Sequence, residues 1–160
     1  MQSSKWGSHM WFYLHTVSFN YPETNPTTEQ KKNIYNLFDN LQYTLPCKYC
    51  RDSYKIFFKY FDINQYLNDR MGLTFYTYIL HNLVNMKLNK SKISFIDAVN
   101  KYEKIRANSL FNINKNIEFA NNSENKYRKI TKHLLHKLIH SNESPIPLNV
   151  WHNKNDDYLA

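Results

Sequence analysis

The sequence predicts an all-α fold, and three features of the 160 residues support this prediction. Glycine occurs only twice and proline five times, so the turns of a sheet protein have few candidate positions. Apolar residues recur at spacings of three and four, which is the period of an amphipathic helix. Residues that favour helix N-termini precede several of these stretches. With 42% hydrophobic residues, the chain can form one domain with a substantial core.

Two helices are expected in the first part of the chain. The first covers Trp6 to Ser18, where aromatic and apolar residues return to one face, and it ends before the pair Tyr21-Pro22. The second covers Thr27 to Tyr43, because a capping-box pair opens a stretch with a clear apolar stripe. A short loop between the two helices follows from these limits.

Three further helices are expected in the middle of the chain. One covers Cys47 to Phe61, with aromatic residues along one side. The next covers Thr74 to Leu88 and carries several polar residues on one face. A shorter fifth helix begins after Ser94, which is typical of an N-cap, and continues through Ile105.

The composition changes beyond Phe111. The sequence becomes polar and poor in apolar periodicity, and a helical pattern returns only at 130–139, before a segment broken by prolines. We therefore expect a domain over residues 1–109 and a C-terminal, mostly helical extension over residues 110–160.

The net charge of +8 raises the possibility of nucleic-acid binding, because basic proteins gain affinity from phosphate neutralisation. The lysines are scattered among asparagine, isoleucine and tyrosine residues, so nucleic-acid binding is not favoured as the main function. The sequence contains no apolar run of about 18 residues and no secretory-signal pattern. Neither a membrane span nor a signal peptide is expected.

The only two cysteines, Cys47 and Cys50, form a CxxC motif at the start of the third expected helix. Zinc would need further ligands, which His133, His136 and His140 could supply, but solvated surface histidines are the simpler interpretation. A structural disulfide would close too short a loop to stabilise much. A redox centre fits better, because a helix N-terminus stabilises a thiolate and the two sulfurs can exchange.

The fourth expected helix carries an unusual polar face in the segment "HNLVNMKLNK". His81, Asn82 and Asn85 lie close together on this helix, Leu88 continues the stripe, and Lys90 follows its end. Buried amides and imidazoles need hydrogen-bond partners. Two interpretations are open: a hydrogen-bonded network in the core, or the lining of a polar, phosphate-bearing cofactor site.

Three motifs in order resemble the flavin-dependent sulfhydryl oxidases of the Erv/ALR family. The segment "HNLVNMKLNK" is similar to the family's HNxVNxxLxK element, and "PCKYC" matches its PCxxC active site. The early stretch "WGSHMWFYLHTVSFNYP" resembles its G-x-x-x-W-x-x-L-H element. The resemblance covers about Trp6 to Tyr102 and implies a four-helix bundle with a short fifth helix, bound FAD, and a homodimer.

The resemblance also implies roles for individual residues within 1–109. Cys47 and Cys50 would form the redox disulfide beside the flavin, and no metal is expected. Tyr102 stands where the family usually has tryptophan, and Asn89 replaces the glycine of the family's LGK. The residues expected to bind FAD are Gly7, Trp11, His15, Tyr78, His81, Asn82, Asn85, Leu88, Lys90, Lys101 and Tyr102.

The function implied by the resemblance is disulfide formation in protein substrates, with electrons passing through FAD to oxygen and giving hydrogen peroxide. The mobile second cysteine pair of many relatives is missing, so substrate thiols would react at Cys47 directly or through a partner shuttle protein. Compact forms of this kind resemble those of large DNA viruses, which implies a host cytoplasm or a virion as the location. The alternative is a zinc-stabilised or basic interaction module without enzymatic activity.

Overall fold

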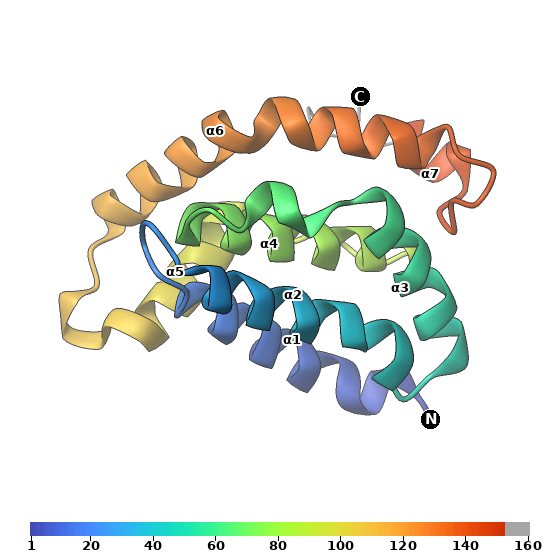
Figure 1. Ribbon diagram of the computed structural model, residues 1–160, viewed down its shortest axis with the longest axis horizontal. Helices are drawn as coiled ribbons and strands as arrows, with labels where there is room; N and C mark the ends of the chain where they lie inside the picture. The colour runs from blue at the N-terminus through green and yellow to red at the C-terminus, as the bar shows by residue number, and fades with distance from the viewer. Residues whose placement is uncertain (153–160) are drawn as a thin grey trace.

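The computed structural model describes residues 1–152, and helices dominate this part of the chain (Figure 1). No β-strand is present in the described residues, which confirms the all-α prediction. The α-helices are α1 (Ser3–Phe19), α2 (Thr28–Thr44), α3 (Lys48–Tyr60), α4 (Arg70–Lys87), α5 (Phe95–Ala107), α6 (Ile113–Ile139) and α7 (Leu148–His152), and 3-10 turns lie at Ile63–Tyr66 and Asn108–Leu110.

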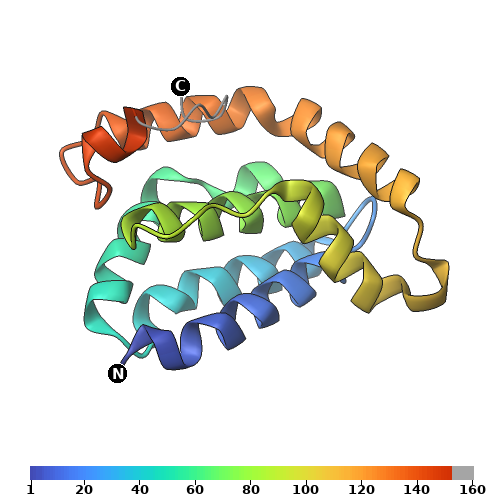
Figure 2. The ribbon, with the colours of Figure 1, turned by 180° about the vertical axis from the view of Figure 1, so that it is seen from behind.

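Helices α1 to α4 form a bundle, and α5 packs beside α1 and α4 (Figures 1 and 2). Helix α4 lies at the centre, and most of its side chains are buried, because it contacts α1, α5 and α6. Helix α6 runs along the opposite face from α1 and α2 and contacts α3, α4 and α5. The predicted bundle with a short fifth helix is therefore confirmed.

The expected capping residues begin their helices. The Thr27 hydroxyl accepts a hydrogen bond from the Gln30 amide at 3.1 Å, and the Gln30 side chain accepts one from the Thr27 amide at 2.8 Å. The Ser94 hydroxyl likewise accepts from the Asp97 amide at 3.2 Å. These contacts satisfy backbone donors that the first turn of a helix leaves free.

Helix α4 begins at Arg70, earlier than the expected Thr74. The Asp69 carboxylate caps it by accepting a hydrogen bond from the Gly72 amide at 2.7 Å. A Cβ atom on Gly72 would lie 2.3 Å from the carbonyl oxygen of Tyr66, so this first turn has room only for glycine. The early start was missed because the sequence analysis did not recognise Asp69 as the N-cap of this helix.

Helix α6 corrects the expectation for the C-terminal part. The helix is continuous from Ile113, whereas helical structure was expected only over 130–139. Its buried face is built from small and polar side chains in its first half, so the apolar period is weak there. The buried residues are Asn116, Ala120, Ser123, Tyr127, Thr131, Leu134, Leu135 and Leu138.

Polar contacts fasten α6 to the rest of the bundle. The Tyr127 hydroxyl donates to Asp69 at 2.9 Å, and Lys126 forms an ion pair with the same carboxylate. The hydroxyls of Tyr66 and Thr131 are hydrogen-bonded at 2.7 Å. The proposed division between residues 1–109 and 110–160 therefore separates segments that are in close contact, and it stays a prediction.

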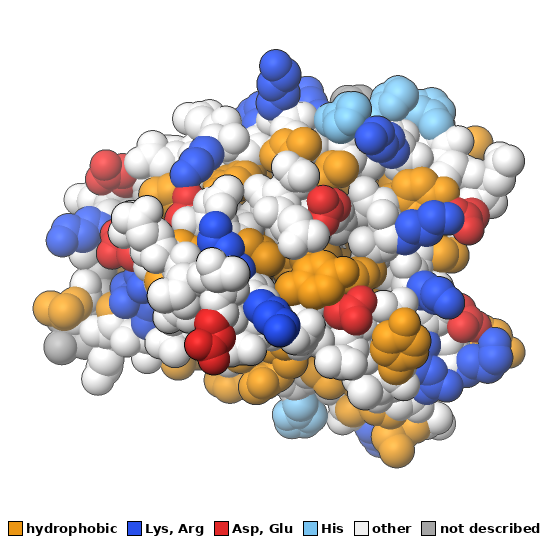
Figure 3. Space-filling model, viewed as in Figure 1, with side chains coloured by type: hydrophobic (Ala, Val, Ile, Leu, Met, Phe, Trp, Pro, Cys, Tyr) orange, Lys and Arg blue, Asp and Glu red, His pale blue; other side chains and the backbone are white. Residues whose placement is uncertain are grey.

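On the face shown in Figure 3, Lys and Arg side chains are spread among hydrophobic, acidic and other side chains. The positive charge is thus distributed over this face and does not form one continuous patch. Within residues 1–152, none of the helices has both the length and the apolar character needed to cross a membrane.

Candidate functional site

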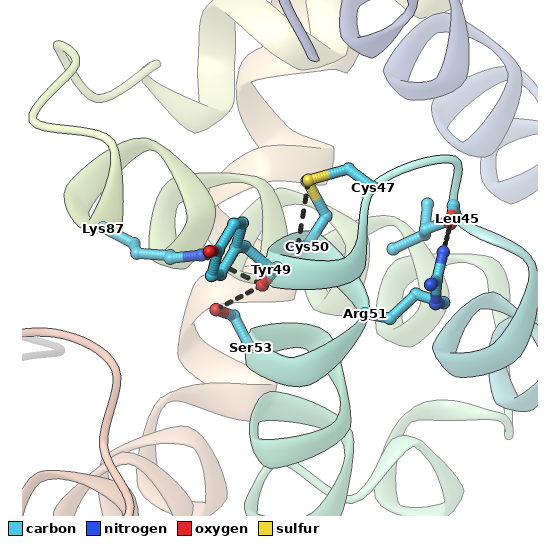
Figure 4. The surroundings of a disulfide bond; sticks show 7 residues. All are labelled: Leu45, Cys47, Tyr49, Cys50, Arg51, Ser53 and Lys87. Atoms are coloured by element: carbon cyan, nitrogen blue, oxygen red, sulfur yellow. Dashed lines mark hydrogen bonds between the residues drawn. A yellow bond between two sulfur atoms is a disulfide. The ribbon is translucent and has the colours of Figure 1, made fainter. Parts of the chain in front are cut away.

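The two cysteines form a disulfide at the start of α3, and their Cα atoms are 5.1 Å apart (Figure 4). Cys47 is the N-cap of α3, and its Sγ accepts a hydrogen bond from the Cys50 amide at 3.3 Å. A sulfur at this position receives backbone N–H groups and the positive end of the helix dipole. The fold therefore places Cys47 where a thiolate is stabilised.

Hydrogen bonds on both sides hold the turn that carries the disulfide (Figure 4). The carbonyl oxygen of Tyr49 accepts from Lys87 Nζ at 3.3 Å and from Ser53 Oγ at 2.9 Å. Arg51 Nη1 donates to the carbonyl oxygen of Leu45 at 2.6 Å. Because Lys87 belongs to α4, its contact ties the CxxC turn to the helix that carries the predicted cofactor residues. Partial burial lowers the pKa of the Lys87 ammonium.

A cavity of about 320 Å³ opens beside the disulfide, a volume within the usual range for small-molecule sites of about 300 to 1,000 Å³. Its walls come from α1, the end of α2, α3, α4 and α5. Most of the residues predicted from the sequence meet here. Those that line it are Gly7, Trp11, Cys50, His81, Asn85, Leu88, Lys90, Lys101 and Tyr102.

The four remaining predicted residues lie outside the cavity lining. Cys47 reaches the cavity only through its bond to Cys50. His15 lies behind His81, to which it is hydrogen-bonded. Tyr78 packs against Phe95, with ring centroids 4.9 Å apart.

Asn82, the last of the four, faces the segment that follows α4. Its side-chain amide donates to the carbonyl oxygen of Ile93 at 3.0 Å, and its carbonyl oxygen accepts from the Ile93 amide at 2.9 Å. The core-network interpretation therefore holds for Asn82, and the cofactor-site interpretation of His81 and Asn85 stays a prediction. Asn82 takes part in a core network, whereas His81 and Asn85 line the cavity.

Four rings from three helices form two stacked pairs at and behind the cavity wall, and the two pairs are tilted by 47° to each other. Trp11 lies parallel to His81, with centroids 4.1 Å apart and an interplanar angle of 9°. Tyr102 stacks on His15 at 4.7 Å and 14°. His15 Nε2 lies 3.0 Å from His81 Nδ1, which joins the two pairs. The two pairs bring aromatic rings from α1, α4 and α5 together.

Both imidazoles of these pairs are neutral near pH 7. Burial, together with the charges of His81 and Lys101, lowers the pKa of His15 to about 3. Burial and the charges of Lys101 and Lys90 lower the pKa of His81 to about 4. Each ring can therefore both donate and accept a hydrogen bond, and His15 Nδ1 is buried without a partner among the described residues.

The end of α4 holds Lys90 in place at the cavity. Asn89 has a φ of 54°, the left-handed conformation that glycine favours and asparagine tolerates. The Asn89 amide donates to the Met86 carbonyl at 3.1 Å, and the Lys90 amide donates to the Asn85 carbonyl at 2.8 Å. This is a Schellman motif, so the asparagine found in place of the family's glycine adopts the conformation that the motif requires.

The cavity side chains suit a dinucleotide that carries flat ring systems. The stacked rings offer aromatic faces, Asn85 and His81 offer hydrogen bonds, and Lys90 and Lys101 offer cations for phosphate groups. Apart from these groups, the lining is mostly apolar. No cluster of three or more His, Cys, Asp or Glu side chains that could hold a metal ion occurs in the described residues.

The sequence prediction missed several cavity residues. Trp6, Met10 and Val84 lie beside predicted residues, but nothing in their pattern distinguishes them from core residues. Tyr54 and Phe57 were expected on the aromatic side of α3, and only the tertiary structure shows that these two residues line the cavity. Leu41, Leu45, Ser53 and Lys87 also line it.

Comparisons with known proteins identify a family and several similar proteins. The Erv1/Alr family model matches residues 8–108. A probable FAD-linked sulfhydryl oxidase of Acanthamoeba polyphaga mimivirus is 34% identical over 105 residues, which is 65% of this chain and 73% of the relative. The FAD-linked sulfhydryl oxidase of an African swine fever virus isolate (Tick/Malawi/Lil 20-1/1983) is 31% identical over 106 residues, or 66% of this chain and 86% of the relative.

A solved structure of an Erv1 protein has a similar fold. The yeast Erv1 core superposes with a TM-score of 0.57 at 26% identity, covering 66% of this chain and 83% of that one. Fold and site together define a helical redox protein with a CxxC disulfide beside a cavity lined by aromatic, amide and lysine side chains. Since the family model matches more than half of its residues, the chain belongs to the Erv1/Alr family.

Proposed function

We propose that this chain is an FAD-linked thiol oxidase that forms disulfides in protein substrates through the Cys47–Cys50 pair. One observation carries the proposal: the disulfide lies at a helix N-terminus and Cys50 lines the cavity of predicted cofactor residues. The names of the viral relatives support both the cofactor and the reaction. Residues 8–108, which match the family, contain the disulfide and the whole cavity lining from Ser8 onward.

The first half of the reaction is thiol–disulfide exchange. A substrate thiolate attacks Cys47 Sγ, the bond to Cys50 breaks, and Cys50 leaves as a thiolate facing the cavity. A second substrate thiolate then attacks the substrate sulfur of the mixed disulfide and releases Cys47 as a thiolate. The Cys50 amide and the α3 N-terminus stabilise that thiolate. Two substrate thiols thus become one disulfide, and the enzyme holds two electrons as its reduced pair.

The second half of the reaction restores the Cys47–Cys50 disulfide. Bound FAD supplies the chemistry of accepting these two electrons and passing them, with two protons, to oxygen to give hydrogen peroxide. The stacked rings of Trp11 and His81 would hold its flat ring systems, and Lys90 and Lys101 would neutralise its phosphate charge. Apolar side chains of the lining limit the access of water.

The partners follow from the same proposal. This sequence contains no other cysteine than Cys47 and Cys50, so any relay disulfide would come from a shuttle protein. Otherwise, substrate thiols react at Cys47 directly. A homodimer is proposed from the family resemblance.

The visible spectrum of the purified chain tests the proposal. We expect a flavin absorbance band, and oxygen consumption with an equal amount of hydrogen peroxide when dithiothreitol is added. A colourless protein that binds zinc in a one-to-one ratio would contradict the proposal and would support an interaction module.

A further inference from the structure

The solvent side of α3 carries cations next to the disulfide. Lys48, Arg51 and Lys55 follow one another at spacings of three and four, so they share one face of the helix. Lys48 and Lys55 are exposed, and Arg51 is partly buried. Cys50 and Tyr54 lie on another face of α3 and line the cavity. The helix therefore has one side that faces the cavity and a basic side that faces solvent.

One carboxylate lies among these cations. Lys48 Nζ and the Asp52 carboxylate form an ion pair at 2.8 Å. This hydrogen bond is the main reason why the pKa of the Asp52 carboxyl is lowered, and the charges of Arg51 and Lys55 lower it further. The Lys87 ammonium, whose pKa is lowered by burial, also interacts with the charge of Asp52. Four cations thus lie near one anion, so these groups leave an excess of positive charge at the start of α3.

The turn that carries the disulfide is accessible from the same side of the molecule. Cys47 is partly exposed, and Tyr49, between the two cysteines, is 78% exposed. Hydrogen bonds from Lys87 and Ser53 hold the Tyr49 carbonyl oxygen, so the aromatic ring extends from a fixed turn (Figure 4). A large exposed ring beside a reactive sulfur offers contact area to a peptide that docks there.

We propose that the exposed side of α3 at the CxxC turn docks substrate segments in which acidic residues lie beside the reactive cysteine. This docking surface consists of Lys48, Tyr49, Arg51 and Lys55. The inference rests on the proposed function, because it concerns the partner whose thiolate attacks Cys47. Opposite charges increase the rate at which an acidic segment meets the surface, whereas a segment rich in lysine or arginine is repelled. Docking precedes the exchange and adds no step to it.

The test measures oxygen consumption by the FAD-containing protein with two synthetic dithiol peptides. The peptides share one Cys-x-x-Cys core and differ only in their flanking residues, which are glutamate in one and lysine in the other. Each value of kcat/KM is divided by the rate at which the same peptide reduces hydroxyethyl disulfide, so differences in thiol reactivity cancel. We expect the wild type to prefer the glutamate peptide by about tenfold at low ionic strength. Added NaCl should reduce this preference, because salt screens exposed charges.

Lys55→Glu tests the docking surface, because Lys55 is exposed and does not line the cavity. We expect this variant to reduce the preference for the glutamate peptide by about threefold to tenfold. The matched control is Lys115→Glu, the same change of charge in the exposed first turn of α6. The start of α6 lies at the opposite end of the molecule from α3 (Figures 1 and 2), so the control should keep the wild-type preference.

A second variant, Lys48→Gln, keeps the proposal testable if Lys55→Glu does not fold, and it should shift the preference in the same direction. Equal normalised values for the two peptides in the wild type, or an unchanged preference in the variants of the docking surface, would overturn the proposal. An equal loss in Lys115→Glu would also overturn it, because the preference would then reflect only the net charge of the chain. A wild-type chain that consumes no oxygen with dithiothreitol would instead overturn the proposed function, so the two failures are distinguishable.

Discussion

His15 Nε2 and His81 Nδ1 lie 3.0 Å apart and join α1 to α4 at the wall of the cavity. One ring must donate and the other must accept, which is possible only if at least one of these nitrogens is unprotonated. Two charged imidazoles could not form this contact, and burial lowers both pKa values, to about 3 for His15 and about 4 for His81. The contact is therefore lost when both rings are protonated, and the lowered pKa values keep both rings neutral above about pH 4.

This relationship predicts that stability falls in acid. In the unfolded chain both histidines titrate near their ordinary pKa of 6.5, whereas the folded chain resists protonation down to about pH 4. Below pH 6.5 the unfolded state binds more protons, so the free energy of unfolding decreases as the pH falls, by up to about 1.4 kcal/mol per pH unit for each proton. Above pH 7 these two histidines should not change the free energy of unfolding.

Urea unfolding of flavin-free protein between pH 7.5 and 4.5 measures this dependence. His81→Gln should show a smaller slope, because one of the two titrating rings is gone. The matched control is His133→Gln on α6, where the ring is exposed and the slope should stay that of the wild type. Equal slopes in all three proteins would contradict the neutral pair.

Cys50→Ser should abolish dithiol oxidation and retain FAD. Cys50 is the cysteine that lines the cavity, so its sulfur is the one placed to deliver electrons. Oxygen consumption with dithiothreitol and the flavin absorbance of the purified variant measure the two effects. Cys47→Ser should also stop turnover, because no disulfide can form. Continued oxygen consumption by Cys50→Ser would show that the assignment of Cys50 is wrong.

Asn82 and Asn85 are nearly adjacent on α4, and we expect their alanine variants to fail in different ways. Asn85 lines the cavity, so Asn85→Ala should keep its fold and bind FAD about tenfold to a hundredfold more weakly, the effect of losing about 1 to 3 kcal/mol. Asn82 makes two hydrogen bonds to the Ile93 backbone, so Asn82→Ala should mainly lower the free energy of unfolding. Thermal unfolding and FAD titration of both variants check this. Unchanged FAD affinity in Asn85→Ala would contradict a role in FAD binding and would favour the core-network interpretation for Asn85.

The different surroundings of Asn82 and Asn85 could not be predicted from the sequence. The motif identified the polar face of α4 correctly, because helical spacing alone places His81, Asn82 and Asn85 close together. The direction of each side chain depends on neighbours outside the helix. The Asn82 side chain is hydrogen-bonded to the Ile93 backbone, and the Tyr78 ring packs against Phe95. Periodicity within one helix carries no information about such partners.

The two glycines also differ in a way that helical periodicity does not reveal. A Cβ atom on Gly72 would lie 2.3 Å from the Tyr66 carbonyl oxygen and 2.7 Å from the Tyr127 hydroxyl, whereas one on Gly7 would meet nothing within 4 Å. Gly72→Ala should therefore lower the free energy of unfolding by about 1 to 3 kcal/mol through overpacking. Thermal and urea unfolding measure the effect. A Gly72→Ala protein as stable as the wild type would show that the α4 start and α6 can separate at no cost.

Gly7→Ala should act in the opposite direction on stability. Gly7 lies inside α1, where alanine is favoured over glycine by about 0.5 to 1 kcal/mol, so flavin-free protein should unfold at a higher temperature. Because Gly7 lines the cavity, the added methyl group should also weaken FAD binding. A variant that is more stable and binds FAD as tightly as the wild type would exclude contact between the cofactor and Gly7.

The division at residue 109 yields the last prediction, because every residue that lines the cavity lies at or before Tyr102. Helix α6 should therefore contribute stability and no direct contact to FAD. Leu135 is fully buried on α6, so Leu135→Ala should lower the free energy of unfolding by about 2 to 5 kcal/mol. Its dissociation constant for FAD should remain that of the wild type under conditions where the variant is folded. A Leu135→Ala protein that is folded but has lost FAD affinity would show that α6 helps to shape the site, and residues 1–109 would then not form a complete functional unit.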